Sequence, residues 1–453
     1  MAVEGRDVVI VGGGLAGLSA GVALADAGFR VALLESKPAP GGRAYSFTDD
    51  ATGDLVDNGQ HVMMGCYHET LKFLDRLGTS GQLIVHPNLA IEMLDRSGRS
   101  AILKTARLPG PLHMTAALLR YRHLTVGERA RTLSGGLRLM RTWKRNPQKL
   151  RQTTVSDMMD ELGQGDRARQ CFWYPLAIAT LNEDPKLASA GLLATVLERA
   201  FFARRADSAF LYSRVGLSDL YCPSATAIIE KSDGVVACRS IVEALEFDEN
   251  QAIAVRLRDG ASLQAANFVL AVPPDQLLKL LPEGAAADPF FALIQNLHSS
   301  PIICVHLWLD REVTQSAFTG FIGTTTQWLF NKRRIFAAHG ASHPGYLSFV
   351  ISGARGLADR SNEDLLHIVL DDLHAMIPAS REAGVLKALV LKEKHATIAT
   401  DPASDLSRPP VATPIPNVFL AGDWVQTGLP ATIESAVISG NSASRAIVDR
   451  VNA

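Results

Sequence analysis

The chain has 453 residues, of which 47% are hydrophobic and 20% are charged, and its formal net charge is −1. The balance of charge is almost neutral, so nothing in the overall composition indicates binding to nucleic acid. The length exceeds the size at which a single hydrophobic core stops growing, so we expect two domains with room for a buried cofactor.

The five cysteines are widely separated and form no C-x-x-C pair. This spacing excludes a zinc site and a dithiol redox centre, and we expect no bound metal. Unclustered cysteines in odd number fit a reducing, cytoplasmic location, where each is expected to be a small buried hydrophobe. The sequence also has no uninterrupted run of about eighteen apolar residues, so a membrane-spanning helix is not expected.

Close to the start of the chain, an apolar run leads into three glycines and then into a helix of small residues. Gly12 permits the tight turn from strand to helix, Gly14 lets the backbone approach a pyrophosphate, and Gly17 lets the helix pack closely on the strand. The first helical residues, Leu15 and Ala16, then present free N–H groups and the positive end of the helix dipole to the phosphates. The pattern predicts the start of a dinucleotide-binding fold.

A second apolar run, at 30–34, ends in Glu35, about twenty residues after the glycines, where an acid can accept hydrogen bonds from ribose hydroxyls and disfavours a 2′-phosphate. The following loop contains Ser36, Gly42 and Arg43. Glycines in this loop allow close backbone approach, and an arginine can pair with a phosphate. We therefore expect this loop to belong to the same cofactor site.

From about residue 67 to residue 206, apolar residues recur at every third and fourth position, which predicts mostly helix. Within this region, residues 101–150 hold eleven Lys or Arg and a single acid, Glu128. A basic amphipathic segment is typical of binding to an anionic membrane surface, where each cation is worth about 1 kcal/mol. The alternative is an ordinary pair of helices with a solvated basic face.

Strand patterns return in the second half of the chain, and they are expected at 235–239, 240–245, 252–260 and 268–272. The third of these ends in Asp-Gly, a strong hairpin signal, and the fourth is stopped by two prolines. Alternating runs from 302 to 351 predict an antiparallel sheet, and residues 363–377 predict a helix across it.

The C-terminal region repeats the order of strand, polar turn and helix. A strand at 417–421 ends in Gly422-Asp423, and a helix begins near Pro430, where the missing N–H of proline does no harm. This arrangement predicts a second contact with the phosphate and ribityl parts of a cofactor. The two ends of the chain are therefore expected to close on one cofactor.

Four motifs together resemble the superfamily of FAD-dependent amine oxidases and phytoene desaturases, and the resemblance covers the whole chain: Gly12-x-Gly14-x-x-Gly17, Glu35, Gly41-Gly42-Arg43 and Ala421-Gly422-Asp423-Trp424. The resemblance implies FAD as the cofactor and an α/β fold, α+β overall. A Rossmann-type FAD-binding domain would be assembled from residues 1–75, 207–280 and 400–453. A substrate domain of antiparallel sheet plus helices would comprise residues 76–206 and 281–399.

The same resemblance implies roles for residues in the middle and at the end of the chain. The backbone at Val242 would meet the adenine, and Gly422 with Asp423 would bind ribityl or pyrophosphate oxygens. The last helix would direct its N-terminus at the flavin through Ala431, Thr432 and Ile433.

Three stretches, at 57–67, 173–182 and 422–434, resemble the squalene-associated branch, the hydroxysqualene dehydroxylases of bacterial hopanoid synthesis. The last is the most specific, because it reads Thr-Gly-Leu-Pro-Ala-Thr-Ile-Glu where carotenoid desaturases carry Pro-Gly-x-Gly. The branch implies that an allylic hydroxyl is removed: a general acid helps water to leave, and the N5 atom of the reduced flavin delivers a hydride. No second glycine fingerprint follows a strand, so we expect an external electron donor.

For this chemistry, His61 is the candidate proton donor, since its ordinary pKa is near 6.5, and Asp57 is a candidate to orient it. The alternative is that His61 and Asp57 only close a hydrogen-bonded turn. Trp173 and Tyr174 are candidates to wall a lipid tunnel and stabilise a cation through their π faces, against the alternative of plain core. Trp424 is a third candidate for substrate contact.

The expected partners are an isoprenoid lipid, the electron donor and an anionic membrane, with the protein cytoplasmic and peripheral on the inner face of the cell membrane. One alternative is a carotenoid desaturase or isomerase, or an amine oxidase, of the same superfamily. An amine oxidase would require a second aromatic residue beside Trp424 at the flavin. A further alternative is a non-catalytic escort protein for isoprenoids, which would have lost the phosphate-binding glycines that this chain keeps.

Overall fold

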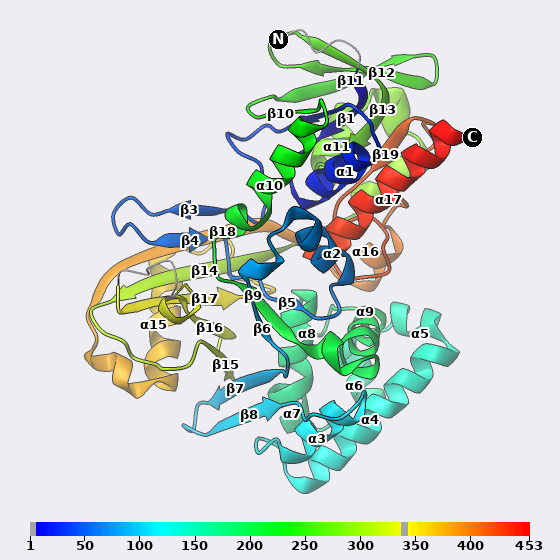
Figure 1. Ribbon diagram of the computed structural model, residues 1–453. Helices are drawn as coiled ribbons and strands as arrows, with labels where there is room; N and C mark the ends of the chain where they lie inside the picture. The colour runs from blue at the N-terminus through cyan, green and yellow to red at the C-terminus, as the bar shows by residue number, and fades with distance from the viewer. Residues whose placement is uncertain (1–5, 337–342) are drawn as a thin grey trace.

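The computed structural model describes residues 6–336 and 343–453. Residues 1–5, within the predicted FAD-binding domain, and residues 337–342, within the predicted antiparallel sheet, lie outside the described residues. The described chain has an upper part around a parallel sheet, a second sheet beside it and a lower lobe of helices (Figure 1).

The parallel sheet is assembled from three distant parts of the chain. Strand β1 (Arg6–Val11) lies between β2 (Val31–Leu34) and β13 (Ser262–Leu270). Parallel pairing continues to β10 (Val235–Ala237) on one side and to β19 (Val418–Leu420) on the other. The discontinuous origin that was expected of this sheet is therefore confirmed.

Both faces of this sheet are covered. Val8 and Ile10 of β1 are fully buried in one cluster with three helices, whereas Val9 and Val11 belong to a cluster on the opposite face. The helices on the first face are α1 (Leu15–Asp26), α10 (Leu217–Lys231) and α17 (Ile433–Asn452). The opposite cluster includes residues of α11 (Pro274–Leu280) and α13 (Pro289–Ala292). Because both faces are buried, the strands are almost continuously apolar, as parallel strands usually are.

An antiparallel extension joins this sheet through β11 (Val242–Asp248) and β12 (Gln251–Leu257). The predicted Asp-Gly hairpin is present, since β12 pairs antiparallel with β13 and Val255 lies opposite Leu263. Strand β13 ends at Leu270, shortly before the two prolines, as the sequence indicated.

The second sheet has the strand order β18-β14-β17-β16-β15-β7-β8, and all pairings are antiparallel except that of β15 with β7. Its strands are β7 (Ala90–Asp95), β8 (Ser100–Lys104), β14 (Ser299–Leu309), β15 (Phe318–Ile322), β16 (Trp328–Asn331), β17 (Gly345–Ile351) and β18 (Val385–Ile398). Helix α15 (Asn362–Met376) packs on one face of this sheet. The predicted antiparallel sheet and its covering helix are both confirmed.

The prediction that residues 67–206 are mostly helical is wrong for part of this region. Residues 83–104 form β6 (Leu83–His86), β7 and β8 instead. Strands β7 and β8 are short, they turn at Gly98 with φ of +79°, and β7 pairs with a strand that follows more than two hundred residues later. A partner so distant leaves no local signal in the sequence.

The remainder of that region is the lower lobe, which contains α3 to α9 (Figure 1). Its helices are α3 (Leu112–Arg120), α4 (Val126–Arg145), α5 (Pro147–Gln152), α6 (Val155–Glu161), α7 (Asp166–Ala168), α8 (Tyr174–Leu181) and α9 (Ala190–Leu197). Short π-helical turns at Arg169–Trp173 and Glu198–Phe202 interrupt the regular helix.

Smaller elements connect these parts: β3 (Ser46–Thr48), β4 (Leu55–Asp57), β5 (Met63–Met64), α2 (His68–Leu77), β9 (Phe210–Ser213), α12 (Glu283–Ala286), α14 (Lys332–Ile335) and α16 (Pro402–Leu406). Strand β9 pairs with both β5 and β6, and it carries the chain from the lower lobe back to α10. Among the described residues, no helix is both long and apolar enough to cross a membrane.

Candidate active site

The turn between β1 and α1 can be formed only by glycines. Gly12 has a φ of +110°, and a Cβ atom at this residue would lie 2.4 Å from the carbonyl oxygen of Ala271. A Cβ atom at Gly17 would lie 1.9 Å from the carbonyl oxygen of Gly12. The first glycine therefore makes the turn and the third lets α1 approach it, in the roles that the sequence predicts.

The second glycine leaves open space that fits a pyrophosphate. Gly14 is the N-cap of α1 and has no side chain with which to cap the helix, so the donors of the first turn at Leu15 and Ala16 are left for a ligand. A Cβ atom at Gly14 would meet only the Cα atom of Gly42, at 3.7 Å. Gly42, with φ of +63°, brings the second glycine loop against the first. Two backbone loops without side chains thus form a cradle for phosphates.

Glu35 ends β2 directly beside this cradle. Its Oε2 atom accepts a hydrogen bond from the N–H of Gly13 at 2.7 Å, and its Oε1 atom accepts from the Ser36 hydroxyl at 3.1 Å. The N–H of Ser240 donates to the carbonyl of Glu35 at 2.9 Å, which brings the start of β11 and Val242 to the same place. The predicted acid and the predicted adenine-binding segment are therefore neighbours.

Arg43 and Asp423 join the beginning of the chain to its end. The Nη2 atom of Arg43 lies 2.5 Å from the Oδ1 atom of Asp423, and its Nη1 atom donates to the carbonyl of Ala396 at 2.8 Å. Gly422, with φ of +151°, donates its N–H to the Ser439 hydroxyl at 2.8 Å. The ion pair therefore brings together the N-terminal and C-terminal segments that the sequence predicts to contact one cofactor. Contact of these residues with the cofactor itself stays a prediction.

Arg408 holds the loop that follows Asp423, a role that no motif in the sequence indicates. Its buried guanidinium donates to the carbonyls of Asp423 at 2.6 Å and Val425 at 2.7 Å, and also to those of Trp424 and Leu429. One arginine thus satisfies four backbone acceptors of the 423–429 loop. It also donates to the Ser435 hydroxyl at 3.3 Å and lies 3.8 Å from the Asp405 carboxylate, but most of its partners are main-chain atoms, which leave no pattern in the sequence.

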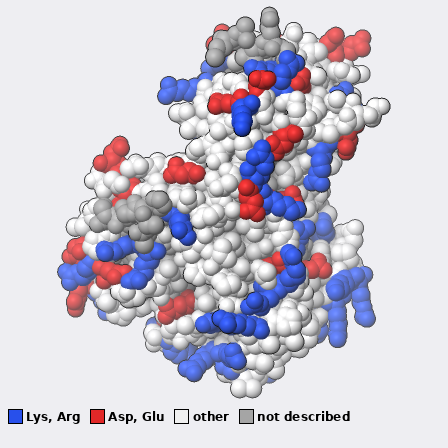
Figure 2. Space-filling view, in the orientation of Figure 1, with Lys and Arg blue, Asp and Glu red and all other residues white. Residues whose placement is uncertain are grey.

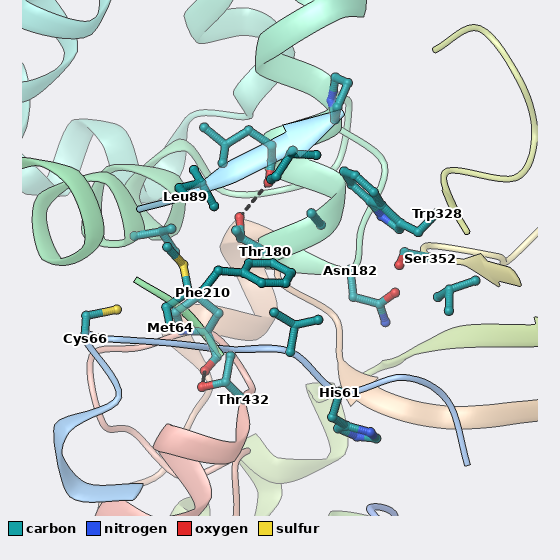
Figure 3. Close-up of a pocket in the computed structure, with 18 of the residues that line it drawn as sticks. His61, Met64, Cys66, Leu89, Thr180, Asn182, Phe210, Trp328, Ser352 and Thr432 are labelled. Carbon is teal, nitrogen blue, oxygen red and sulfur yellow. Dashed lines mark hydrogen bonds between the residues drawn. The ribbon is translucent and has the colours of Figure 1, made fainter. Parts of the chain in front are cut away.

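A cavity of about 340 Å³ extends from this region into the lower lobe. One end is lined by His61, by the 429–434 segment and by the ends of β17 and β18, and the other end lies beneath β7, β8 and α3. Figure 3 shows His61 and Thr432 toward one end and Leu89 toward the other. Ala431, Thr432 and Ile433, predicted to face the flavin, all line the cavity, and Thr432 caps α17 by accepting from the N–H of Ser435.

Polar groups in the cavity gather where α8 meets β17 and β18. Asn182 has a φ of +51°, and its amide donates to the Thr397 hydroxyl at 2.8 Å. Its Oδ1 atom accepts from the N–H of Gly353 at 2.8 Å, next to Ser352. Asn182 and Ser352 lie close together in Figure 3. Because Arg43 binds the carbonyl of Ala396, this polar cluster of Asn182, Ser352 and Thr397 lies at the cofactor end of the cavity.

His61 lines the same end of the cavity. Its Nδ1 atom lies 3.0 Å from the carbonyl oxygen of Gly59, so in the neutral ring this nitrogen carries the proton and donates it. Burial lowers the pKa of His61, and the charges of Lys332 and Arg43 contribute in the same direction. Within the described residues, Nε2 has no hydrogen-bond partner and is the nitrogen left for a ligand.

Asp57 does not orient His61 directly. Its Oδ2 atom lies 2.8 Å from the Nζ atom of Lys332, and both side chains are almost completely buried. Its Oδ1 atom accepts from the Ser46 hydroxyl at 2.8 Å, while Lys332 also donates to the Gln60 side chain at 2.7 Å. Asp57 therefore has a structural role: it holds together the segments that carry Ser46 and Lys332. Lys332, which the sequence analysis missed, fixes the loop that carries His61.

The expectation that Trp173 and Tyr174 wall the cavity is not met. The Trp173 indole donates to Gln164 at 2.9 Å and is 2% exposed, while the Tyr174 hydroxyl lies 3.4 Å from the Ser156 hydroxyl. The cavity is lined instead by one face of this helical region: Phe172, Pro175, Leu176, Ala179 and Thr180. The cavity residues recur as neighbouring pairs at 171–172, 175–176 and 179–180, one helical turn apart, so Trp173 and Tyr174 between the first two pairs face away from the cavity.

Trp424 is also not part of the cavity wall. Its indole N–H donates to the carbonyl of Val272 at 3.0 Å, and the side chain is buried in the cluster on the far face of the parallel sheet. Trp424 therefore cannot serve as one of the two aromatic residues that an amine oxidase would require at the flavin.

Glu434 is the one carboxylate that lines the cavity. Its oxygens accept from the N–H groups of Glu69 at 3.0 Å and Thr70 at 2.8 Å, and from the Thr70 hydroxyl at 2.7 Å. The carboxylate thus caps the N-terminus of α2, which favours its negative charge. It anchors α17 to α2, and its oxygens are already occupied by these donors.

Comparison with known proteins agrees with this geometry. The family model described as flavin containing amine oxidoreductase matches residues 15–448. The chain belongs to this family. Together with the cradle of backbone donors described above, membership of the flavin-containing amine oxidoreductases establishes FAD as the cofactor.

Among the curated relatives of this chain are two proteins named hydroxysqualene dehydroxylase. The protein from Rhodopseudomonas palustris is 28% identical over 97% of this chain and 97% of its own length. The protein from Sinorhizobium fredii is 28% identical over 99% of both chains. The 15-cis-phytoene desaturase of Solanum lycopersicum is 26% identical over 98% of this chain and 77% of its own length.

Solved structures share the fold. An oxidoreductase from Methanosarcina mazei superposes with a TM-score of 0.76 at 16% identity, covering 97% of this chain and all of the other. The cyclohexylamine oxidase of Brevibacterium oxydans gives a TM-score of 0.72 at 18% identity, covering 99% of this chain and all of the other. The mixed α/β architecture expected from the sequence is confirmed.

Replacing Arg408 with Met is expected to reduce FAD binding. The variant leaves three buried carbonyls of the 423–429 loop without a donor, those of Trp424, Val425 and Leu429, and each such group costs about 1–3 kcal/mol. The measurement is the ratio of flavin to protein absorbance in the purified protein, together with its melting temperature. Arg381→Met, at an exposed arginine, is the control and should keep the full flavin content. An Arg408→Met protein that also kept it would contradict the bracing role.

Breaking the Asp57–Lys332 pair from one side should be costly. Lys332→Met leaves a buried carboxylate without its cation, which lowers the free energy of unfolding by about 3–5 kcal/mol. Adding Asp57→Asn should recover part of this loss, since neither charge then remains buried. Denaturant unfolding of the two single variants and the double variant measures the coupling. Strictly additive losses would show that the two residues do not act as a pair.

Proposed function

We propose that this protein removes the hydroxyl group of hydroxysqualene to give squalene, using reduced FAD. The C–O bond breaks, its electron pair stays with the oxygen, and the oxygen takes up a proton and leaves as water. The carbon receives a hydride, and the bound FAD is left in its oxidised form. Hydroxysqualene and FADH2 thus give squalene, water and FAD. The donor that reduces FAD would come from outside the chain.

The chemical character of the cavity supports this proposal most strongly. Beneath α3 and the β7–β8 hairpin its wall is apolar, with side chains such as Leu89, Met93 and Met114. Its cofactor end carries His61 and the polar cluster of Asn182, Ser352 and Thr397. A long hydrocarbon with a single hydroxyl matches such a cavity, because the hydrocarbon removes apolar surface from water and the hydroxyl finds hydrogen-bond partners.

The same cavity does not suit a cationic amine. Glu434 is the one carboxylate in its wall, and all of its described partners are donors at the start of α2. A buried ammonium group requires an opposite charge or an aromatic cage. Aromatic rings such as Phe210 and Trp328 do line the cavity, but Arg199 lines it too and would repel a cation. Trp424 is buried elsewhere.

The FAD supplies the hydride, and the protein supplies position and a proton. The ring of His61 is fixed through Nδ1 to Gly59, so Nε2 is the nitrogen that would meet the substrate hydroxyl. When the ring is protonated, Nε2–H donates to the leaving oxygen. Burial and the neighbouring cations make the imidazolium a stronger acid than a free histidine, which favours transfer of the proton as the C–O bond breaks.

The relatives support the same substrate class. The curated relatives named above act, by their names, on hydroxysqualene or on 15-cis-phytoene, which are both long isoprenoids. The desaturase is the second candidate, since its identity to this chain is similar. A desaturase removes hydrogen and needs no proton donor for a leaving oxygen. The position of His61 at the cofactor end of the cavity, with Nε2 left for a ligand, therefore favours the dehydroxylase.

Anaerobic incubation of the reduced holoprotein tests the proposal. The FAD-bound protein is reduced with dithionite, freed of excess reductant and mixed with hydroxysqualene. Formation of squalene with matching reoxidation of the flavin is the expected result. Oxidised holoprotein that instead desaturates phytoene or oxidises an amine, with no squalene formed from the reduced protein, would overturn the proposal.

The activity should depend on the protonation of His61. Since the pKa of His61 is lowered from its ordinary value near 6.5, the protonated fraction falls by about tenfold per pH unit above that lowered value. Single-turnover rates should therefore rise as the pH falls toward and below 6.5. His61→Ala should retain yellow bound FAD and lose turnover, and His61→Gln should retain FAD and lose the pH dependence. Unchanged turnover in His61→Ala would remove this residue from the mechanism.

A further inference from the structure

The corner between α3 and α4 exposes large apolar side chains to solvent. Leu112 and Leu119 of α3 are 51% and 53% exposed, and they lie seven residues apart on one face of the helix. At the start of α4, Val126 is 79% exposed, and Leu137 further along is 52% exposed. Exposure of apolar side chains to water is unfavourable. When several of them gather on one corner of a lobe, they indicate an interaction surface.

Cations surround these side chains. Exposed Lys and Arg from this part of the chain are Lys104, Arg107, Arg120, Arg122, Arg131, Arg138, Arg141, Lys144, Arg145 and Lys149. In the described part of the chain, only Lys149 among these ten forms an ion pair, with Glu161. Figure 2 shows Lys and Arg gathered on the lower lobe, where α3 to α5 lie. The predicted basic segment is therefore exposed and largely unneutralised.

The corner is held as one rigid unit. The Arg129 side chain donates to the carbonyls of Leu119 at 2.9 Å, Tyr121 at 3.0 Å and Leu124 at 2.9 Å, and so caps the end of α3 from within α4. Glu128, the one acid of the basic segment, is used in the capping box of α4 with Thr125. Arg129 and Glu128 are thus engaged within the fold, and the end of α3 that bears Leu119 is tied to the first turn of α4 that bears Val126.

The inner side of the same helix forms the wall of the cavity. Met114 of α3 and Tyr121, its C-cap residue, line the far, apolar end of the cavity. Helix α3 therefore separates that end of the cavity from the surface that bears Leu112 and Leu119. An apolar molecule that leaves a lipid phase at this corner has only the thickness of one helix to pass.

We propose that the α3–α4 corner docks on the surface of an anionic phospholipid bilayer, with Leu119 and Val126 inserted among the acyl chains and the surrounding cations on the lipid phosphates. Its role in delivering substrate rests on the proposed function, since the isoprenoid would enter the cavity past α3. The docking itself does not depend on which isoprenoid is used.

The chemistry of the corner favours a bilayer over other acidic partners. Cations and apolar side chains alternate along an outward-facing corner, as they do on amphipathic helices that lie in a membrane interface. A nucleic acid offers phosphates but no apolar phase for Leu119 and Val126. A protein partner would be expected to bind a fixed pattern of charges, whereas a bilayer only requires that positive charge be near its surface.

Flotation with vesicles tests the docking surface. The holoprotein is mixed with vesicles of phosphatidylcholine containing phosphatidylglycerol, or of phosphatidylcholine alone, and the bound fraction is measured after flotation. Binding should require the anionic lipid and weaken at high salt. Leu119→Ser with Val126→Ser should lower the partition coefficient by about tenfold or more, because two apolar anchors are lost. Arg120→Gln with Arg122→Gln should lower it about fivefold for each charge removed.

Matched controls lie on the upper part of the molecule. Val451→Ser with Ile253→Ser removes apolar side chains that are 56% and 41% exposed, and Lys231→Gln with Arg445→Gln removes two exposed cations. These variants should bind vesicles like the unaltered protein. Equal losses in controls and corner variants, or no binding to anionic vesicles, would overturn the proposal.

A second measurement separates docking from the proposed reaction. Turnover of hydroxysqualene is compared when the substrate is presented in anionic vesicles and in detergent micelles. The Leu119→Ser/Val126→Ser variant should lose turnover with vesicles and retain it with micelles. If no squalene forms in either case but the vesicle results hold, the proposed reaction fails and the docking surface stands.

Discussion

The ion pair between Arg43 and Asp423 is the interaction on which the cofactor site depends. It joins residues that are 380 positions apart, and it lies where the glycine loops, the end of β18 and the loop braced by Arg408 meet. Parallel pairing of β13 with both β1 and β19 brings the two ends of the chain into one sheet, but the ion pair sets the position of their loops. Helix α17 already packs on α1, and the ion pair adds a direct side-chain link between the second glycine loop and the loop that precedes α17.

A second constraint governs the cavity, which contains few charges that are free to act. The oxygens of Glu434 are occupied by donors at the start of α2, and Asp57 is paired with Lys332 behind the His61 loop. Burying either charge without its partner would be strongly unfavourable, so both are used to hold the structure together. What remains for a ligand is one histidine nitrogen, the exposed guanidinium of Arg199 and a small polar cluster in an otherwise apolar wall. This combination favours an uncharged substrate with a single polar group.

The sequence predicted the glycine turn and the position of Glu35 beside it, because the signals are local: Gly12, Gly17 and Glu35 occur in a fixed order along one strand, helix and strand. It predicted less of the cavity. Trp173 was chosen for its aromatic ring, yet which residue of a helix faces a cavity depends on packing against other elements. Lys332 and Arg408 were missed because their partners are distant in the chain or are main-chain atoms. The β7–β8 hairpin was missed for the same reason, since β15 follows much later.

Loss of the oxygen and gain of a hydrogen at one carbon is the central chemical claim, and isotope labelling tests it most directly. The reduced holoprotein is allowed a single anaerobic turnover of hydroxysqualene in D2O, where the transferable hydrogen of the reduced cofactor exchanges with solvent. Mass spectrometry should find squalene that has lost the hydroxyl oxygen and carries one deuterium at the carbon that bore it. Squalene without deuterium, or recovery of hydroxysqualene alone beside reoxidised flavin, would contradict the account.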